Sequence, residues 1–211
     1  MRHRNIKGAY EKLEIHPKVV DKPEEFKGKW KKLFDNNNPI YIEIGMGKGQ
    51  FISRHAKNNP NINYIGFEKY SAVLAKGLEK IDKDKLDNIY VIREDAENIL
   101  DFFEEGELEG LYLNFSDPWP KDRHAKRRLT HSSFLEKYKS LLKKGSFIEL
   151  KTDNDKLFEF SIEQLEKENI TIDKQTRDLY ASPLLEGNIP TEYEEKFHAQ
   201  SISINKLRAY C

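Results

Sequence analysis

The topology of this 211-residue chain follows from Ile40-Tyr41-Ile42-Glu43-Ile44-Gly45-Met46-Gly47-Lys48-Gly49-Gln50, in which a β-branched run leads into three glycines. Glycine allows a tight turn and a close approach of the backbone to a ligand, so the pattern predicts a strand, a ligand-binding loop and a helix start. The loop is not of the Walker type, which needs four residues between its first glycine and Gly-Lys-Ser/Thr. It also lacks the third glycine of the dinucleotide fingerprint, because Gln50 stands there. A nicotinamide-dependent oxidoreductase is therefore disfavoured.

Strand-like and helical segments alternate on both sides of this loop. Apolar residues in Tyr70–Ile81 recur with the period of one helix face, and Phe158–Leu165 repeats the pattern. Ser133, with Glu136 three residues later, is typical of a capping box that opens another helix. Segments of this length that alternate in this way predict βαβ units on a parallel sheet. The predicted strands are Ile40–Ile44, Ile62–Phe67, Ile89–Ile92, Leu111–Phe115 and Phe147–Leu150.

The pattern changes after residue 168. Ile170–Ile172 and Ile202–Ile204 alternate with period two, which predicts an antiparallel ribbon at the edge of the sheet. The expected fold class is therefore α/β, a mostly parallel sheet with an antiparallel edge strand and helices on both faces. Residues 1–38 show little regular periodicity and are expected to form an N-terminal extension, a candidate for mobility. The domain is expected to span residues 39–211.

Charge is balanced over the whole chain but not along it. The 36 Lys and Arg residues match 36 Asp and Glu residues, yet residues 121–151 hold ten basic and three acidic residues, and residues 79–110 hold four and twelve. The one cysteine is Cys211, which excludes a disulfide scaffold or a zinc ribbon, and no metal site is expected. No run approaches the length of apolar residues that spans a membrane, so a cytoplasmic protein without membrane association is expected.

Acidic residues follow the first three predicted strands, at the edge where ligands of an open parallel sheet bind. Glu43 lies two residues before Gly-x-Gly-x-Gly, which resembles motif I of class I S-adenosylmethionine (SAM) methyltransferases, whose ligand carries cationic sulfonium and ammonium groups. Glu68 stands at the ribose-binding position of nucleoside-binding sheets, and Asp95 fits the adenine-contacting acid of such methyltransferases. Each acid alone has an ordinary structural explanation, such as an exposed residue at a helix start. Three acids after three consecutive strands favour a nucleoside site.

The fourth strand leads into a proline-stiffened loop and then into a basic segment. Two prolines fix the backbone around Trp119 and hold Asp117 at the sheet edge. A carboxylate beside an aromatic ring suits a flat base, although a hydrophobic plug is an equally open interpretation of Trp119. The residues from Lys121 to Arg128 include five basic side chains and a histidine. A charge run is usually a solvated face, but its place directly after this loop favours contacts with phosphates.

Three blocks together resemble one known family. The sequence from Asp117 to Thr130, Asp-Pro-Trp-Pro-Lys-Asp-Arg-His-Ala-Lys-Arg-Arg-Leu-Thr, resembles the signature of bacterial tRNA (guanine-N7)-methyltransferases. Glu149-Leu-Lys-Thr-Asp153 and Thr191-Glu-Tyr-Glu-Glu-Lys-Phe197 resemble two further family blocks in the expected order. The resemblance covers about residues 40–197, and it implies a Rossmann-like class I fold, SAM as the methyl donor and a variable-loop guanine of tRNA as the acceptor.

The resemblance also implies roles for individual residues. Asp122 stands where the family often has a second lysine, and for Glu192 no side-chain role is claimed. The residues implied to line the SAM site are Glu43, Gly45, Gly47, Gly49, Glu68, Asp95 and Asp117. Those implied to contact the substrate or its RNA are Trp119, Lys121, Arg123, His124, Lys126, Arg127, Arg128, Asp153, Thr191, Glu192, Tyr193 and Glu194.

The chemistry of the acceptor points to Asp117 as the catalytic residue. Guanine N7 carries a lone pair and no proton, so its methylation needs no general base, and orientation is the main task of the enzyme. Asp117 is expected to accept hydrogen bonds from the N1–H and N2–H₂ edge and to stabilise the growing ring charge. Two alternatives stay open: a class I methyltransferase for another RNA base or a small molecule, and an RNA-binding protein without catalysis. A monomer and a homodimer are both compatible with the sequence.

Overall fold

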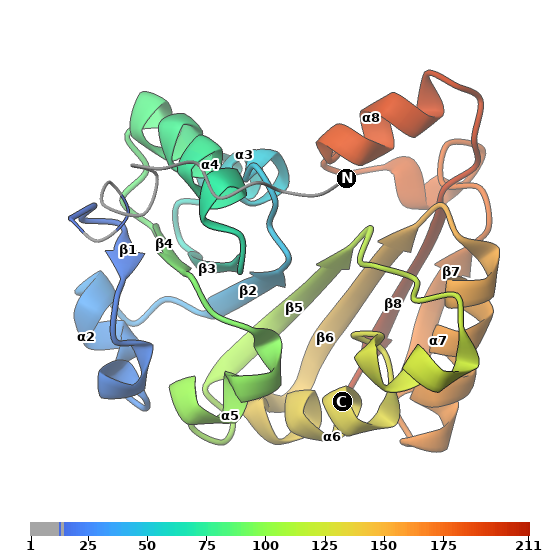
Figure 1. The fold of residues 1–211 in the computed structure, drawn as a ribbon, viewed down its shortest axis with the longest axis horizontal. Coiled ribbons are helices and arrows are strands. Elements are labelled where there is room, and N and C mark those ends of the chain that lie inside the picture. The colour runs from blue at the N-terminus through green and yellow to red at the C-terminus, as the bar shows by residue number, and fades with distance from the viewer. Residues whose placement is uncertain (1–12, 14) are drawn as a thin grey trace.

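One eight-stranded sheet forms the centre of the molecule, with its strands in the order β1-β4-β3-β2-β5-β6-β8-β7. The computed structural model, drawn in Figure 1, describes residue 13 and residues 15–211. The strands are β1 Val19–Val20, β2 Ile40–Ile44, β3 Asn63–Phe67, β4 Ile89–Ile92, β5 Leu108–Asn114, β6 Leu142–Thr152, β7 Thr171–Thr176 and β8 Asn205–Tyr210. The α-helices are α2 Trp30–Phe34, α3 Gln50–Asn58, α4 Ser71–Asp84, α5 Ile99–Phe102, α6 Ser132–Leu141, α7 Asp155–Lys167 and α8 Glu192–His198. Short 3₁₀ helices are η1 Pro23–Phe26, η2 Ala96–Asn98, η3 Asp122–Arg127 and η4 Pro183–Leu185.

The strand directions confirm the predicted fold class. The pairs from β1 across to β6 are all parallel, whereas β8 runs antiparallel between β6 and β7. The predicted antiparallel ribbon therefore lies at this edge of the sheet. Its second strand begins at Asn205, directly after the expected Ile202–Ile204. The carbonyl of Ile204 instead accepts a hydrogen bond from the amide of Leu179, in the loop after β7.

The sheet separates two apolar cores, because successive side chains of a strand point to opposite faces. Trp30, Phe102 and Tyr138 belong to the core between the sheet and helices α2, α5, α6 and α7. Phe51 and Leu78 belong to the core that α3 and α4 cover on the other face. Helices thus lie on both faces, as predicted (Figure 1). Within the described residues, no helix combines the length and the apolar character needed to cross a membrane.

The part of residues 1–38 that the structure describes packs against the rest of the chain. β1 pairs with β4 at the edge of the sheet. Trp30 is 0% exposed, donates from Nε1 to the carbonyl of Phe102 at 2.9 Å and stacks on Phe103 with ring centroids 5.3 Å apart. A two-residue strand and a five-residue helix are too short to show a hydrophobic period. The expectation for residues 1–12 and 14 lies outside the described residues.

The start of α6 differs from the predicted capping box. The helix begins at Ser132, and its N-cap is His131, whose Nδ1 accepts from the amide of Ser133 at 3.2 Å. Burial, with help from the nearby Lys126, lowers the pKa of His131, which keeps the ring neutral and able to accept. Ser133 therefore lies in the first turn, and its box with Glu136 was a wrong prediction.

Candidate active site

The glycine loop between β2 and α3 has a conformation that favours glycine. Gly45, Gly47 and Gly49 have φ angles of 78°, 58° and 69°, a left-handed region that costs other residues about 1–2 kcal/mol each. The amides of Gly45 and Met46 both donate to the carbonyl of Phe67 at 2.9 Å, which ties the loop to the end of β3. A Cβ on Gly45 or Gly47 would meet no atom within 4 Å. The loop therefore has an open side on which a ligand can approach the backbone.

Glu43, near the end of β2, is a buried carboxyl group with one unsatisfied oxygen. Its Oε1 accepts from Nδ2 of Asn114 at 2.8 Å, while Oε2 has no hydrogen-bond partner among the described residues. Burial raises the pKa of Glu43 to about 7, an effect that the hydrogen bond from Asn114 opposes only in part. A buried acceptor in this state gains when a cationic group becomes its partner.

Glu68 and Asp95 follow β3 and β4, the strands next to β2 on that side of the sheet. Glu68 accepts from the amide of Gly47 at 3.2 Å through Oε2 and from the amide of Tyr70 at 2.9 Å through Oε1. Asp95 caps η2 and lies 3.6 Å from the Lys69 ammonium. The three predicted acids thus gather at the carboxyl edge of neighbouring strands, and Glu68 directly fixes the glycine loop.

The loop after β5 is held in a strained conformation that exposes Asp117. Phe115 and Trp119 have φ angles of 50° and 40°, the left-handed region that bulky residues avoid. Arg128 restrains the turn, because its Nε and Nη2 donate to the carbonyls of residues 118 and 119 at 3.1 Å each. The side chain of Asp117 remains exposed to solvent at the end of β5.

The ring of Trp119 is engaged within the protein. The guanidinium of Arg127 lies over it, 5.0 Å from the ring centroid, and the imidazole of His124 meets it edge-on with centroids 5.8 Å apart. These contacts support the packing interpretation of Trp119. Stacking of Trp119 on a base stays a prediction.

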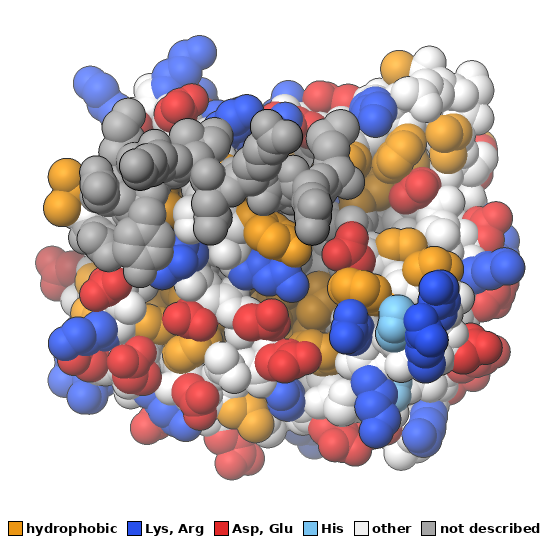
Figure 2. Space-filling model, in the orientation of Figure 1, with side chains coloured by type: hydrophobic (Ala, Val, Ile, Leu, Met, Phe, Trp, Pro, Cys, Tyr) orange, Lys and Arg blue, Asp and Glu red, His pale blue; other side chains and the backbone are white. Residues whose placement is uncertain are grey.

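The basic segment presents cations without acidic partners. Lys121, Arg123, Lys126 and Arg127 are exposed, and none of them forms an ion pair within the described part of the chain. In Figure 2, Lys, Arg and His side chains gather at the lower right, on the side of the molecule where Figure 1 shows α7. Arg128 differs, because it is half-buried over an aromatic ring of α7 and bonded to the loop before it.

A buried ion pair joins the first turn of α8 to β6. Thr191 caps the helix, and its Oγ1 accepts from the amide of Glu194 at 2.9 Å. Glu194 was predicted to contact the substrate, yet its side chain is 0% exposed and its Oε2 lies 2.5 Å from Nζ of Lys151. Asp153, just beyond β6, is partly exposed and has no hydrogen-bond or ion-pair partner within the described residues.

The first turn of α8 reaches both the glycine loop and the loop after β5. Glu192 lies 2.9 Å from Nζ of Lys48 and 2.5 Å from Nζ of Lys80. Partial burial raises the pKa of Glu192, but the hydrogen bonds from these two lysines outweigh it, so the pKa is lowered overall. Tyr193 is 56% exposed and stacks on Phe115, with ring centroids 6.2 Å apart. The glycine loop and the loop after β5 are thereby joined through the first turn of α8.

Comparison with known proteins assigns the family. Residues 37–207 match a family model described as a putative methyltransferase. A tRNA (guanine-N(7)-)-methyltransferase of Lachnoclostridium phytofermentans is 53% identical over 210 residues, which cover 100% of this chain and 98% of that protein. A Geobacillus protein of the same name is 49% identical over 201 residues, covering 95% and 91%. The chain belongs to this methyltransferase family. It is therefore an enzyme whose methyl donor is SAM.

Solved structures with low sequence identity show the same fold for this methyltransferase. The 16S rRNA methyltransferase KamB superposes with a TM-score of 0.65 at 12% identity, over 87% of this chain and 92% of that chain. An antibiotic-related methyltransferase superposes with a TM-score of 0.62 at 19% identity, over 92% and 96%. These likenesses confirm a Rossmann-like class I methyltransferase fold.

The residues at the carboxyl edge fit the family's cofactor. The unsatisfied Oε2 of Glu43 suits a cationic ligand, and the open side of Gly45 and Gly47 leaves room beside the backbone. Glu68 and Asp95 supply further carboxylates on the adjacent strands. When bound, SAM supplies an electrophilic methyl group. No group of three or more His, Cys, Asp or Glu side chains is placed to hold a metal ion in the part of the chain that the structure describes.

Sequence reasoning missed three residues that organise this methyltransferase site. Asn114 orients Glu43, Lys48 joins the glycine loop to α8, and Lys151 anchors residues 188–194. Lys151 lies inside the quoted block from Glu149 to Asp153, where its place among apolar strand residues was the available signal. The partners of Asn114 and Lys48 come from distant strands and helices, so no local pattern indicated them.

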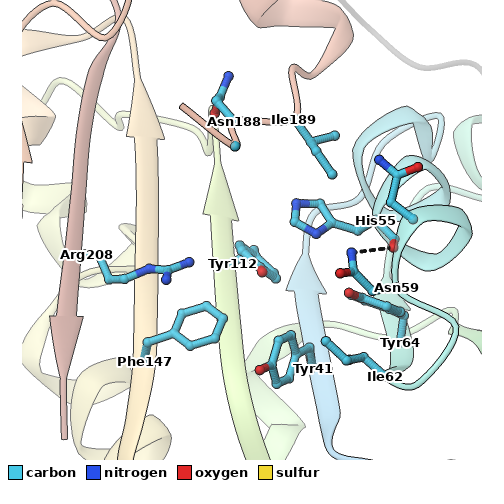
Figure 3. A pocket seen from close by; sticks show the side chains of 12 residues that line it. Tyr41, His55, Asn59, Ile62, Tyr64, Tyr112, Phe147, Asn188, Ile189 and Arg208 are labelled. Atoms are coloured by element: carbon cyan, nitrogen blue, oxygen red, sulfur yellow. Dashed lines mark hydrogen bonds between the residues drawn. The ribbon is translucent and has the colours of Figure 1, made fainter. Parts of the chain in front are cut away.

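A cavity of about 460 Å³ lies on the α3 side of the sheet and contains none of the predicted site residues. Figure 3 shows His55 projecting from α3 over the strands toward Tyr112, with Tyr41 and Phe147 along the floor and Arg208 on the far side. Burial, together with the nearby Lys151, Lys206 and Arg208, lowers the pKa of His55 to about 3, so the ring is neutral. The cavity shares Asn188 and Ile189 with the segment that leads into α8.

Proposed function

We propose that this methyltransferase modifies N7 of a guanine in the variable loop of tRNA, and that this base binds between the loop 115–119 and the first turn of α8. The names of the full-length relatives support the reaction. The observation that carries the placement is the double contact of α8, which pairs with the glycine loop through Glu192 and stacks on Phe115 through Tyr193. A base held there lies between the donor side and Asp117.

Orientation is the main contribution of the protein in this proposal. N7 attacks with its own lone pair, so no side chain has to remove a proton. The site must hold the base in line with the methyl group that it receives. Holding the two reactants in this geometry lowers the reaction barrier, because the loss of translational and rotational entropy occurs on binding. The exposed carboxylate of Asp117 accepts from the N1–H and N2–H₂ edge of guanine, which selects the base and offsets the positive charge that the ring gains.

Tyr193 is the aromatic side chain best placed to stack on the base. It is 56% exposed, and its neighbour Phe115 lies two residues before Asp117. Trp119, in contrast, is covered by Arg127 and His124. Base stacking on an exposed ring contributes roughly 1–3 kcal/mol per base. The base therefore meets Tyr193 on its face and Asp117 on its edge.

The basic segment from Lys121 to Arg128 binds the tRNA backbone in this proposal. Lys121, Arg123, Lys126 and Arg127 are exposed and have no acidic partner within the described residues. Free cations of this kind contact phosphates without reading sequence. The segment directly continues the Asp117 loop, so the backbone is held next to the methylated base.

Methyl transfer to defined transcripts tests this function. Unmodified tRNA is incubated with the enzyme and methyl-labelled SAM, and the modified base is then mapped by cleavage at N7-methylguanosine. We expect label in tRNA with a variable-loop guanine and none in the same tRNA with that guanine changed to adenine. Label at another base would favour a different class I RNA methyltransferase. Absence of label in any RNA would favour a small-molecule acceptor.

A further inference from the structure

Lys151 of β6 is a buried lysine whose ammonium has a complete set of partners. Its side chain is 0% exposed, and a buried charge is costly unless it is paired and hydrogen-bonded. Nζ donates to Oε2 of Glu194 at 2.5 Å, to the carbonyl of Ile189 at 2.8 Å and to Oδ1 of Asn188 at 3.3 Å. An ammonium has three N–H groups, so none of them is left unused.

All three partners lie in residues 188–194, the segment that includes Tyr193. The second oxygen of Glu194 accepts from Nδ2 of Asn188 at 2.6 Å and from the hydroxyl of Tyr180 at 3.3 Å. The segment thus packs around the Lys151 ammonium, and Lys206 of β8 adds a longer bond to Oδ1 of Asn188 at 3.5 Å. Removal of the Lys151 ammonium leaves a buried carboxylate unpaired, which costs more than the loss of a single contact.

Lys151 also contacts the Asp117 loop, through its backbone. Its carbonyl accepts from the amide of Phe115 at 2.8 Å. In the register of β5 and β6 it lies opposite Asn114, which holds Glu43. One residue therefore fixes the loop that carries Asp117 with its main chain and residues 188–194 with its side chain.

We propose that Lys151 is a positioning residue for methyl transfer: its buried ammonium sets residues 188–194 at the distance from the loop 115–119 that the guanine requires. The inference rests on the proposed placement of the base between these two segments. Lys151 has no exposed atom with which to touch the substrate, so it acts through Glu194 and the backbone of Ile189. Its loss shifts residues 188–194, whereas the bonds of the glycine loop to the carbonyl of Phe67 and to Glu68 do not involve Lys151.

The test compares Lys151→Met with Lys143→Met, the same change on the same strand at a half-exposed lysine. Because a small misplacement of a positioning group costs on the order of 10²-fold, we expect kcat/KM for tRNA to fall by about that factor in Lys151→Met, mainly in kcat. The charge of Lys151 also favours the ionised form of Glu43, so SAM affinity is measured by calorimetry at mildly basic pH, where it should fall far less than kcat/KM. Added hydrogen exchange should be confined to residues 188–198. Lys143→Met should match wild type throughout. A folded Lys151→Met with wild-type tRNA kinetics overturns the inference.

A double-mutant cycle with Glu194→Gln separates positioning from direct substrate contact. If the two residues act as a unit, the double variant loses no more activity than the worse single variant. Multiplied losses would mean that Glu194 acts on the substrate independently, which overturns the inference.

Asn188→Ala is the second test variant, for the case that Lys151→Met does not fold. It keeps the ion pair between Lys151 and Glu194 and removes the hydrogen bond from Lys151 to Asn188. It should lower kcat/KM for tRNA several-fold with SAM affinity unchanged, and wild-type kinetics would contradict the inference. Wild-type enzyme without tRNA activity would refute the proposed function instead. Active wild type with an equally active Lys151→Met would refute only the role of Lys151.

Discussion

The two halves of the carboxyl edge differ in charge, burial and backbone. The half at β2, β3 and β4 carries left-handed glycines and acids, of which Glu43 and Glu68 are buried. The half at β5 and β6 carries an exposed Asp117, an aromatic pair and a run of exposed cations. Carboxylate side chains favour a small cationic ligand such as SAM, whereas Lys and Arg side chains without acidic partners favour a polyanion such as RNA. The balanced charge of the whole chain therefore hides two halves of the carboxyl edge that differ in local charge.

The sharpest way to separate the two halves is Asp117→Asn. The amide cannot accept from the guanine edge at both oxygens or offset the ring charge, so we expect kcat on tRNA to fall by about 10²–10³-fold, as for other preorganised groups. Asp117 is also among the residues implied to line the SAM site, so an unchanged SAM affinity would assign it to the base alone, whereas a weakened affinity would place it at both ligands. Single-turnover methyl transfer and calorimetry measure the two effects. Asp122→Asn, an exposed neighbour, is the control, and equal activity of both variants would remove Asp117 from the mechanism.

Tyr193→Ala tests which aromatic ring belongs to the acceptor half. Loss of stacking worth roughly 1–3 kcal/mol should lower kcat/KM for tRNA by about 5- to 150-fold, while Tyr193→Phe keeps most of the activity. Trp119→Phe should have a smaller effect, since that ring packs under Arg127. Steady-state kinetics on tRNA give the comparison. If Trp119→Phe proved the more damaging change, the base would stack on Trp119 instead.

Sequence reasoning placed the three acids at the carboxyl edge, where the structure has them, but it missed tertiary contacts of residues near β5 and β6, for a physical reason. Strand periodicity and the Gly45–Gly49 pattern are local, so both fold class and the three acids followed from them. The roles of Arg128 and Glu194 depend on partners far along the chain or on the turn that the protein forms. A charged residue in a basic run or an acidic helix start looks exposed until the tertiary partner is known.

The described residues before the glycine loop show the same limit. Trp30 fills the core beside α5, yet it lies in a helix of five residues that carries no periodic signal. Periodicity alone did not predict that this segment packs against the domain. Short elements therefore need tertiary contacts to be recognised, whereas long periodic ones such as α4 do not.

SAM binding at the β2–β4 half should depend on pH through Glu43. In the cofactor-free protein the pKa of Glu43 is raised to about 7, so the group is protonated below that pH. A cationic cofactor favours the carboxylate, and SAM affinity should therefore rise with pH through about 7 by at most tenfold per unit. The same raised pKa makes this group's contribution to folding stability fall as pH increases from its ordinary value to about 7.

Calorimetric SAM titrations between mildly acidic and mildly basic pH check this expectation. Glu43→Gln removes the titrating group and should flatten the profile at the weaker affinity. A wild-type profile as flat as that of Glu43→Gln would mean that Glu43 stays neutral in the complex, and the donor half would then bind its cation through Glu68 or Asp95.

The smallest expected effect is on the salt dependence of tRNA binding. It distinguishes basic side chains that contact RNA from those that hold the loop 115–119 in place. Lys126→Ala should weaken tRNA binding a few-fold and reduce the slope of log affinity against log salt by about 0.7–0.9, because one phosphate contact is lost. Lys174→Ala, an exposed lysine on β7, should leave the slope unchanged.

Arg128 donates hydrogen bonds to the carbonyls of residues 118 and 119, so Arg128→Ala should lower kcat more than it changes the slope. Filter binding over a salt series, with kinetics at one salt concentration, resolves the two classes. Unchanged slopes for both Lys126→Ala and Arg123→Ala would assign the segment to a solvated surface, and the tRNA backbone would have to be held elsewhere on the acceptor half.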